Sequence, residues 1–90
     1  MTQAIVDPQD LRRFAAQLHQ FNEELRGGLS GLQAGFTRVG ETWRDQEHER
    51  FAELFAETTE VLAKFIRAGE HHVPYLIRKA EKIEEYLHLR

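Results

Sequence analysis

The interruption of a long helical pattern at residues 40–45 constrains this 90-residue chain more than any other feature. On both sides of it, apolar residues recur at alternating spacings of three and four, which is typical of helices that pack lengthwise on each other. The interruption contains Gly40, Asp45 and the single tryptophan, Trp43. Because connections between antiparallel helices are commonly about two to eight residues long, the chain is predicted to be all-α, an antiparallel two-helix hairpin that forms one domain.

The first helix is predicted over residues 8–39. Asp7 can cap its free N–H groups, and Pro8 suits the first helical position, where a missing N–H needs no partner. The spacing marks one seam along this helix. It comprises Leu11, Phe14, Leu18, Phe21, Leu25, Gly28, Leu32, Gly35 and Val39.

Glycines interrupt this seam, and each weakens a helix interior by about 1 kcal/mol relative to alanine. Gly27, Gly31 and Gly35 also share one stripe at a spacing of four. Because small side chains let another backbone approach closely, we assign Gly28, Gly31 and Gly35 to an interface between chains. A break at Gly27–Gly28, giving two shorter helices, stays open as an alternative, although the periodicity continues in phase across it.

Gly40 is expected to end the first helix in a left-handed conformation, which glycine adopts without a steric penalty. Thr42 or Asp45 can then cap the second helix, which is predicted over residues 46–88. The turn is therefore predicted at residues 40–45, with acidic side chains following in the first turn of the second helix.

Trp43 has two interpretations. It can form an apolar lid over the end of the hairpin, against Phe36, Val39 or Phe51. It can instead be a partly exposed anchor for a partner, since tryptophan is enriched in interface hot spots. The candidate turn and partner-binding residues are Phe36, Gly40, Trp43, Asp45 and Phe51.

The second helix is predicted to carry a seam in two parts. These are Phe51, Phe55, Thr58, Leu62 and Phe65, followed by Val73, Leu76, Ala80, Ile83 and Leu87. Between them, two steps of four through Gly69 form a stutter, which locally relaxes left-handed supercoiling. Pro74 removes one hydrogen bond and clashes with the carbonyl of Glu70, so we expect a kink at residues 69–74 within a continuing helix.

At about 1.5 Å per residue, the helices are roughly 48 and 66 Å long, so the second overhangs the first by about a dozen residues. A chain this short also buries little core by itself. We therefore expect a second chain to cover the overhang, most economically in a two-fold homodimer that forms a four-helix bundle; folding of the tail back over the hairpin is the alternative. The overhang contains Leu76, Ile77, Ile83, Tyr86, Leu87 and Leu89, of which Leu76, Ile83 and Leu87 are assigned to the oligomer interface.

The charged residues argue against one class of partner and are unevenly distributed along the second helix. The net charge is −3, and no concentrated basic face is present, which argues against a nucleic-acid partner. Residues 45–60 carry six acidic and one basic side chain, whereas residues 61–90 carry six basic and four acidic ones. That order complements the helix dipole; an acidic docking patch is the alternative interpretation.

No residue pattern indicates catalysis, a cofactor or a metal. The chain has no cysteine, which excludes disulfides and thiolate sites. His71 and His72 are adjacent and point in different directions on a helix, and Glu47 and Glu49 lie two residues apart on different faces. Without a phosphate-binding loop or a concave fold, no small-molecule substrate is evident, and we predict a protein that is not an enzyme.

The N-terminal segment lacks the basic and apolar regions of a signal peptide, and no apolar run approaches the roughly 18 residues that span a bilayer. We therefore expect a cytoplasmic protein with no membrane span. Export stays open only through a route that needs no cleaved leader.

A chain of about this length, built from two amphipathic helices and a turn with a single central Trp, resembles the WXG family of helical hairpin proteins associated with type VII secretion. The resemblance covers nearly the whole chain and implies the hairpin fold and pairwise assembly. The motif here reads Trp43-Arg44-Asp45, with Asp where Gly is usual. The family also usually carries a Tyr followed four residues later by an acid, as an export signal. Neither tyrosine of the second helix matches it, since the residues at that spacing are Lys79 and Arg90.

Three functions follow as hypotheses, of which the last, a metal-dependent activity, rests on the five histidines alone and has no ligand spacing behind it. The first is a WXG-like binding protein, either a secreted partner or an adaptor and chaperone for a larger helical cargo, acting with its own copy or a related hairpin protein. The second is a self-assembling structural subunit with no role in secretion. The turn with its single Trp favours the first, while the glycine stripe and the apolar overhang favour the second.

Overall fold

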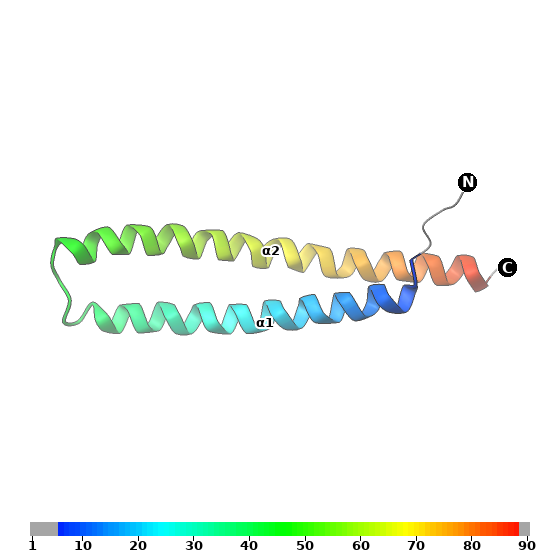
Figure 1. Ribbon diagram of the computed structural model, residues 1–90, viewed down its shortest axis with the longest axis horizontal. Coiled ribbons are helices and arrows are strands. Elements are labelled where there is room, and N and C mark those ends of the chain that lie inside the picture. Colours follow the sequence, from blue (N-terminus) through cyan, green and yellow to red (C-terminus); the bar gives the residue numbers. More distant parts are fainter. Residues whose placement is uncertain (1–5, 89–90) are drawn as a thin grey trace.

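Two long antiparallel helices make up the computed structural model, which describes residues 6–88. Helix α1 spans Pro8–Val39 and helix α2 spans Gln46–His88. The two lie side by side along their length, so the end of α2 returns to the start of α1 (Figure 1). No strand occurs within the described range, and the predicted all-α antiparallel hairpin is confirmed.

Helix α1 starts at the proline and runs without a break. Asp7 is extended, and its Oδ1 accepts a hydrogen bond from the N–H of Gln9 at 2.9 Å, while Pro8 occupies the first helical position. The helix continues through Gly27 and Gly28, so the alternative of two shorter helices is not adopted. The in-phase apolar pattern therefore outweighs the weak helical preference of the glycines.

The left-handed conformation predicted for Gly40 is wrong. Its φ of −63° and ψ of −13° are right-handed. The N–H of Gly40 donates to the Phe36 carbonyl at 3.1 Å, and the N–H of Trp43 donates to the Val39 carbonyl at 2.9 Å. Because these bonds satisfy carbonyls at the end of α1, the helix ends without a left-handed residue.

A side chain at Gly40 would lie close to the end of α1 and to the start of α2. A Cβ at Gly40 would lie 3.3 Å from the carbonyl oxygen of Thr37 and 3.5 Å from Nε2 of His48. Asp45 then caps α2, because its Oδ1 accepts a hydrogen bond from the N–H of His48 at 3.0 Å. Of the two caps predicted, Asp45 is the one used.

At two positions, the buried residue of α1 is the one that follows the predicted seam residue. Ala15 and Asn22 are 1% and 2% exposed, whereas Phe14 and Phe21 are 54% and 50% exposed. The prediction placed the large residues in the contact, but small side chains lie where two helices approach most closely. Half-buried residues complete the row, namely Leu11, Leu18, Leu25, Leu29 and Phe36.

The buried seam of α2 alternates steps of four and three without interruption, so the predicted stutter is wrong. The sequence interpretation took Phe65 as buried, but Phe65 is 45% exposed and Ile66 only 4%. The step to Gly69 is therefore three residues, and the alternation continues. The row comprises His48, Ala52, Phe55, Thr59, Leu62, Ile66, Gly69, Val73, Leu76, Ala80 and Ile83.

Pro74 lies inside α2 and does not end it. The side chain is exposed, so the missing N–H falls away from the buried seam. The kink expected between Gly69 and Pro74 stays a prediction.

Helix α2 extends past α1 at the turn as well as at the open end of the hairpin (Figure 1). Because the extra length is divided between the two ends, the apolar overhang at the open end is shorter than predicted. Leu76, Ile77 and Ile83 are half-buried, so the prediction that the first helix cannot cover them was wrong. Tyr86 and Leu87 remain 62% and 47% exposed. Leu89, the last residue assigned to the overhang, lies outside the described residues.

Neighbouring alanines test the position of the seam. Ala15→Leu should force side chains into a filled contact and destabilise the fold by about 1–3 kcal/mol. Ala16→Leu should change stability by less than about 0.5 kcal/mol, because Ala16 is exposed. Thermal unfolding at one fixed protein concentration measures both. Equal effects of the two substitutions would show that the seam is elsewhere.

Candidate functional site

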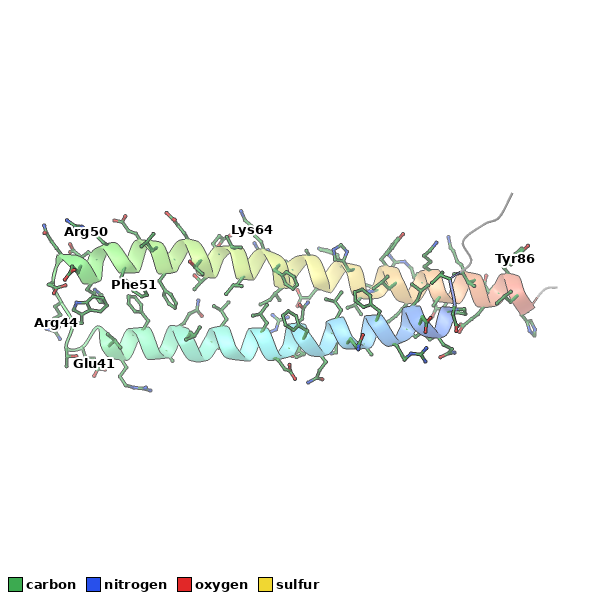
Figure 2. The ribbon with its side chains drawn as sticks, in the orientation of Figure 1. Glu41, Arg44, Arg50, Phe51, Lys64 and Tyr86 are labelled. Atoms are coloured by element: carbon green, nitrogen blue, oxygen red, sulfur yellow. The ribbon has the colours of Figure 1, made fainter. Side chains whose placement is uncertain are left out.

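A cluster of aromatic rings closes the hairpin at its turn. We call it the turn cluster, and it consists of Phe36, Trp43, His48, Phe51 and Phe55. The Phe36 ring stacks on His48 with centroids 5.0 Å apart and contacts Phe55 at the same distance. The Phe51 side chain extends from α2 toward α1 (Figure 2), where its ring lies 5.5 Å from that of Phe36. These ring contacts therefore fix the position of α1 relative to α2 next to the turn.

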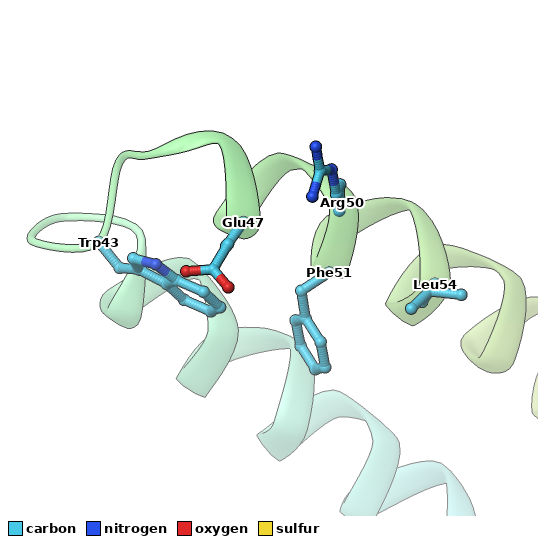
Figure 3. A pocket seen from close by; sticks show the side chains of 5 residues that line it. All are labelled: Trp43, Glu47, Arg50, Phe51 and Leu54. Atoms are coloured by element: carbon cyan, nitrogen blue, oxygen red, sulfur yellow. The ribbon is translucent and has the colours of Figure 1, made fainter.

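Trp43 is half-buried at the outer edge of this cluster. Its ring lies 6.0 Å from Phe51, as the lid interpretation expected, and meets His48 edge-on at 5.0 Å. Trp43 and Phe51 also line an open groove of about 300 Å³ with Glu47, Arg50 and Leu54 (Figure 3). The side chain is thus packed against the hairpin and accessible at a groove, so an anchoring role for it stays a proposal.

His48 belongs to this cluster, which the sequence interpretation did not foresee. Its Nε2 is buried and has no hydrogen-bond partner among the described residues. No signal in the sequence pointed to it, because His48 and Ala52 lie outside the predicted seam of the second helix.

A second feature is a row of mostly exposed residues beside the buried seam. On α1, Phe14, Phe21, Gly28 and Gly35 recur every seven residues and therefore share one flank of the helix. The rings of Phe21 and Phe65 meet edge-on with centroids 5.8 Å apart, so this flank adjoins a flank of α2. The two flanks therefore lie on the same side of the hairpin at this level.

We call this surface the apolar face. It comprises Phe14, Phe21, Leu32 and Val39 of α1, and Phe51, Leu54, Val61, Phe65 and Tyr75 of α2. Leu32 and Leu54 are each 60% exposed, and Val61 is 65% exposed. By contrast, the buried apolar core of the described chain consists of Ala15, Ile66 and Ala80. Large exposed apolar surfaces usually mark interaction sites, so the apolar face is the candidate site.

The glycines assigned to an interface between chains do not pack within the hairpin. A Cβ built at Gly28, Gly31 or Gly35 would meet no atom within 4 Å. These positions do not bring α1 close to α2. Their assignment to an interface with another chain is therefore still a proposal.

An ion pair closes the hairpin opposite the turn. Nη2 and Nε of Arg12 donate to the two carboxylate oxygens of Glu84 at 2.6 and 3.2 Å, and both side chains are 37% exposed. The hydrogen bonds from Arg12 lower the pKa of the Glu84 carboxyl below its ordinary value. Partial desolvation opposes that shift, and the positive charge of Arg12 adds to it. Arg26 and Glu70 form a further ion pair between the helices.

Neither a metal centre nor a membrane span is found in residues 6–88. No group of three or more His, Cys, Asp or Glu side chains in this range could hold a metal ion. None of the described helical segments combines the length and the apolar character that crossing a bilayer requires.

The fold and the turn define a class of small helical hairpin proteins with an aromatic turn. The family model of WXG100, described as proteins of 100 residues with WXG, matches residues 3–86. The chain therefore belongs to the WXG100 family. A comparison with curated proteins finds no match.

Solved structures of similar shape confirm the fold. One is the secreted protein EsxB from Bacillus anthracis, at 19% identity and a TM-score of 0.79, covering 96% of this chain and 98% of that one. A mutant of EsxB gives the same identity and TM-score, with 96% of each chain covered. Another structure of the wild type gives a TM-score of 0.78 at 19% identity, covering 93% and 97% of the two chains.

Apart from Gly28, Gly31 and Gly35, the predicted site residues lie in three places. Phe36, Trp43 and Phe51 meet in the turn cluster, with Gly40 and Asp45 beside it. Leu76 and Ile83 are half-buried in the seam of their own hairpin, whereas Leu87 is exposed near its open end. Most of the apolar face was present in the predicted seams, but it was interpreted there as contact between α1 and α2.

The pKa shift of Glu84 predicts a pH-dependent contribution to stability. Because its folded-state pKa is lowered, the stabilisation is present above the unfolded value of about 4.3 and is lost as pH falls through the folded value. Glu84→Gln should therefore lower Tm slightly at pH 7, and the difference from wild type should vanish near pH 3. Glu85→Gln is the control, since no ion pair to Glu85 occurs within the described residues. An effect of Glu84→Gln that is independent of pH would contradict this assignment.

Proposed function

We propose that this protein is a small, non-enzymatic interaction protein whose apolar face binds a second helical hairpin, a copy of itself. The supporting observation is the contrast between that face and the thin core. Phe14, Phe21 and Phe65 are each 45–54% exposed, while the buried apolar residues are two alanines and one isoleucine. A hairpin that leaves its largest apolar side chains in water gains most by covering them with another chain.

The shape of the surface favours a helical partner. The apolar face runs along both helices, from Phe14 near the open end to Phe51 at the turn. Two further helices laid lengthwise would cover it and complete a four-helix bundle. Gly28 and Gly35 lie in the same row as Phe14 and Phe21, and their open space leaves room for side chains of the partner.

Charge favours a copy of this chain in antiparallel orientation. Residues 45–60 carry six acidic and one basic side chain. Arg78, Lys79 and Lys82 gather around Tyr75 in the second half of α2, and none of them forms an ion pair within the described residues. A two-fold antiparallel pairing places the acidic half of one α2 near the basic half of the other.

Membership in the WXG100 family supports a secretion-related role for this assembly. The similar solved structures are of a protein described as secreted. We propose that the hairpin is a leaderless partner of that kind or an adaptor for a larger helical cargo, with the groove at Trp43 as a second contact. In the native host, Trp43→Ala should then lower the amount of this protein, or of its cargo, in the culture medium while leaving the cellular amount unchanged.

The alternative is a structural homo-oligomer with no secretion role. The open glycine positions and the exposed Leu87 favour self-assembly and say nothing about export. Absence of both the wild-type and the Trp43→Ala protein from the medium would support this alternative, whereas equal amounts of the two in the medium would show that Trp43 is not a contact used in export.

The homodimer predicts a mass twice that of the 10.5 kDa chain. Val61→Glu should weaken the dimer at least about 10-fold, because burying an unpaired charge costs well over 1.4 kcal/mol. Val61 is 65% exposed in the single hairpin, so the substitution should leave helix content unchanged. Light scattering over a concentration series measures mass, and circular dichroism measures helix content.

Ala16→Glu is the matched control, since Ala16 is exposed on α1 outside the apolar face. It should keep the dimer. A wild-type monomer that melts cooperatively at high concentration would contradict the homodimer, as would a Val61→Glu dimer of unchanged affinity.

A further inference from the structure

Asn22 is the buried polar side chain at the middle of the hairpin. It is 2% exposed, and the other buried residues of the described chain are small or apolar. Its Nδ2 donates a hydrogen bond to the backbone carbonyl of Ile66 across the seam at 3.2 Å. Its Oδ1 is buried and has no hydrogen-bond partner in the described residues.

Gly69 makes room for this amide. A Cβ at Gly69 would overlap Nδ2 of Asn22 and would lie 3.0 Å from both its Cγ and its Oδ1. The entire amide group would have to move, because three of its atoms are affected. Gly69 is also the only glycine in α2, so the helix offers one position where Asn22 fits against the backbone.

This arrangement does not maximise stability. An amide buried with one unpaired oxygen is less favourable than an apolar side chain of similar volume in the same place. A glycine in a helix interior is likewise less favourable than alanine. Two locally unfavourable residues that fit each other therefore call for another explanation.

We propose that Asn22 and Gly69 together set the register of the two helices. The other seam residues near them are aliphatic, including Leu18, Leu25 and Leu62, and aliphatic contacts tolerate a slip by a heptad. In a slipped register, Asn22 faces a residue that has a side chain, so its amide is crowded and loses the carbonyl of Ile66. A single buried asparagine selects the register of coiled coils through the same penalty.

The contact between Asn22 and Gly69 therefore determines which residues of α1 and α2 meet on the apolar face. Phe21 and Phe65 directly precede Asn22 and Ile66, and their rings are in contact. The nearby ion pair of Arg26 with Glu70 is about half exposed, and ion pairs of that kind contribute little. This inference concerns the single hairpin and does not depend on the proposed homodimer.

A double-mutant cycle tests the contact. Gly69→Ala alone should lower Tm by roughly 5 °C or more at fixed protein concentration, because the amide of Asn22 is displaced. In an Asn22→Ala background, the same substitution should raise Tm, because alanine is the better helix former and the space is empty. Stabilisation by Gly69→Ala in both backgrounds would overturn the proposal.

Register is then measured directly. Nitroxide labels on cysteines at the exposed positions Ser30 and Glu53 report the separation of α1 from α2, and the sequence has no other cysteine. With unlabelled protein in excess, wild type should give one narrow distance distribution by pulsed electron resonance.

Asn22→Leu should broaden this distribution or add a population displaced along the helix by one heptad, about 10 Å. Gln20→Leu, an exposed substitution on the same helix, is the control and should keep the single distribution. The same narrow distribution in Asn22→Leu would show that the turn alone sets the register, and would overturn the proposal even if the cycle behaves as expected.

Discussion

The close approach of α1 to α2 through small side chains is the constraint on which the rest of this structure depends. Ala15, Gly69 and Ala80 are buried in the seam between the helices, and the amide of Asn22 fills the space beside Gly69. The phenylalanines of α1 at positions 14 and 21 are consequently displaced to the flank, where they are half exposed. One geometric requirement therefore produces both a thin core and an apolar face.

The turn and the open end hold this contact in place by different means. At the turn, Phe36 is in contact with His48, Phe51 and Phe55, and Asp45 caps the helix that follows. Near the other end, a half-buried ion pair joins Arg12 of α1 to Glu84 of α2. Trp43 lies at the edge of this packing and lines an open groove, which is the proposed second contact for a partner.

Helix positions, the turn and the class of fold could be predicted from the sequence, because Asp7, Pro8 and Asp45 act through local chemistry. Which residues of each helix form the buried seam could not be predicted from the sequence. Phe65 and Ile66 are both apolar, and only the packed structure shows that Ile66 is buried. Asn22 looks like a surface residue until it is placed opposite Gly69. Gly40 was misinterpreted because a glycine after a helix usually serves a left-handed turn, whereas here its backbone is right-handed.

The central claim is that a copy of this chain covers the apolar face in antiparallel orientation. Intermolecular distances between labels at Arg50 and Lys82, each on a separate chain, test it most directly. These positions are about 48 Å apart along one α2. The account predicts a short distance, below about 30 Å, between Arg50 of one chain and Lys82 of another, and a long one between two Arg50 labels, because an antiparallel copy reverses the helix. A short distance between two Arg50 labels, or no intermolecular signal, would contradict it.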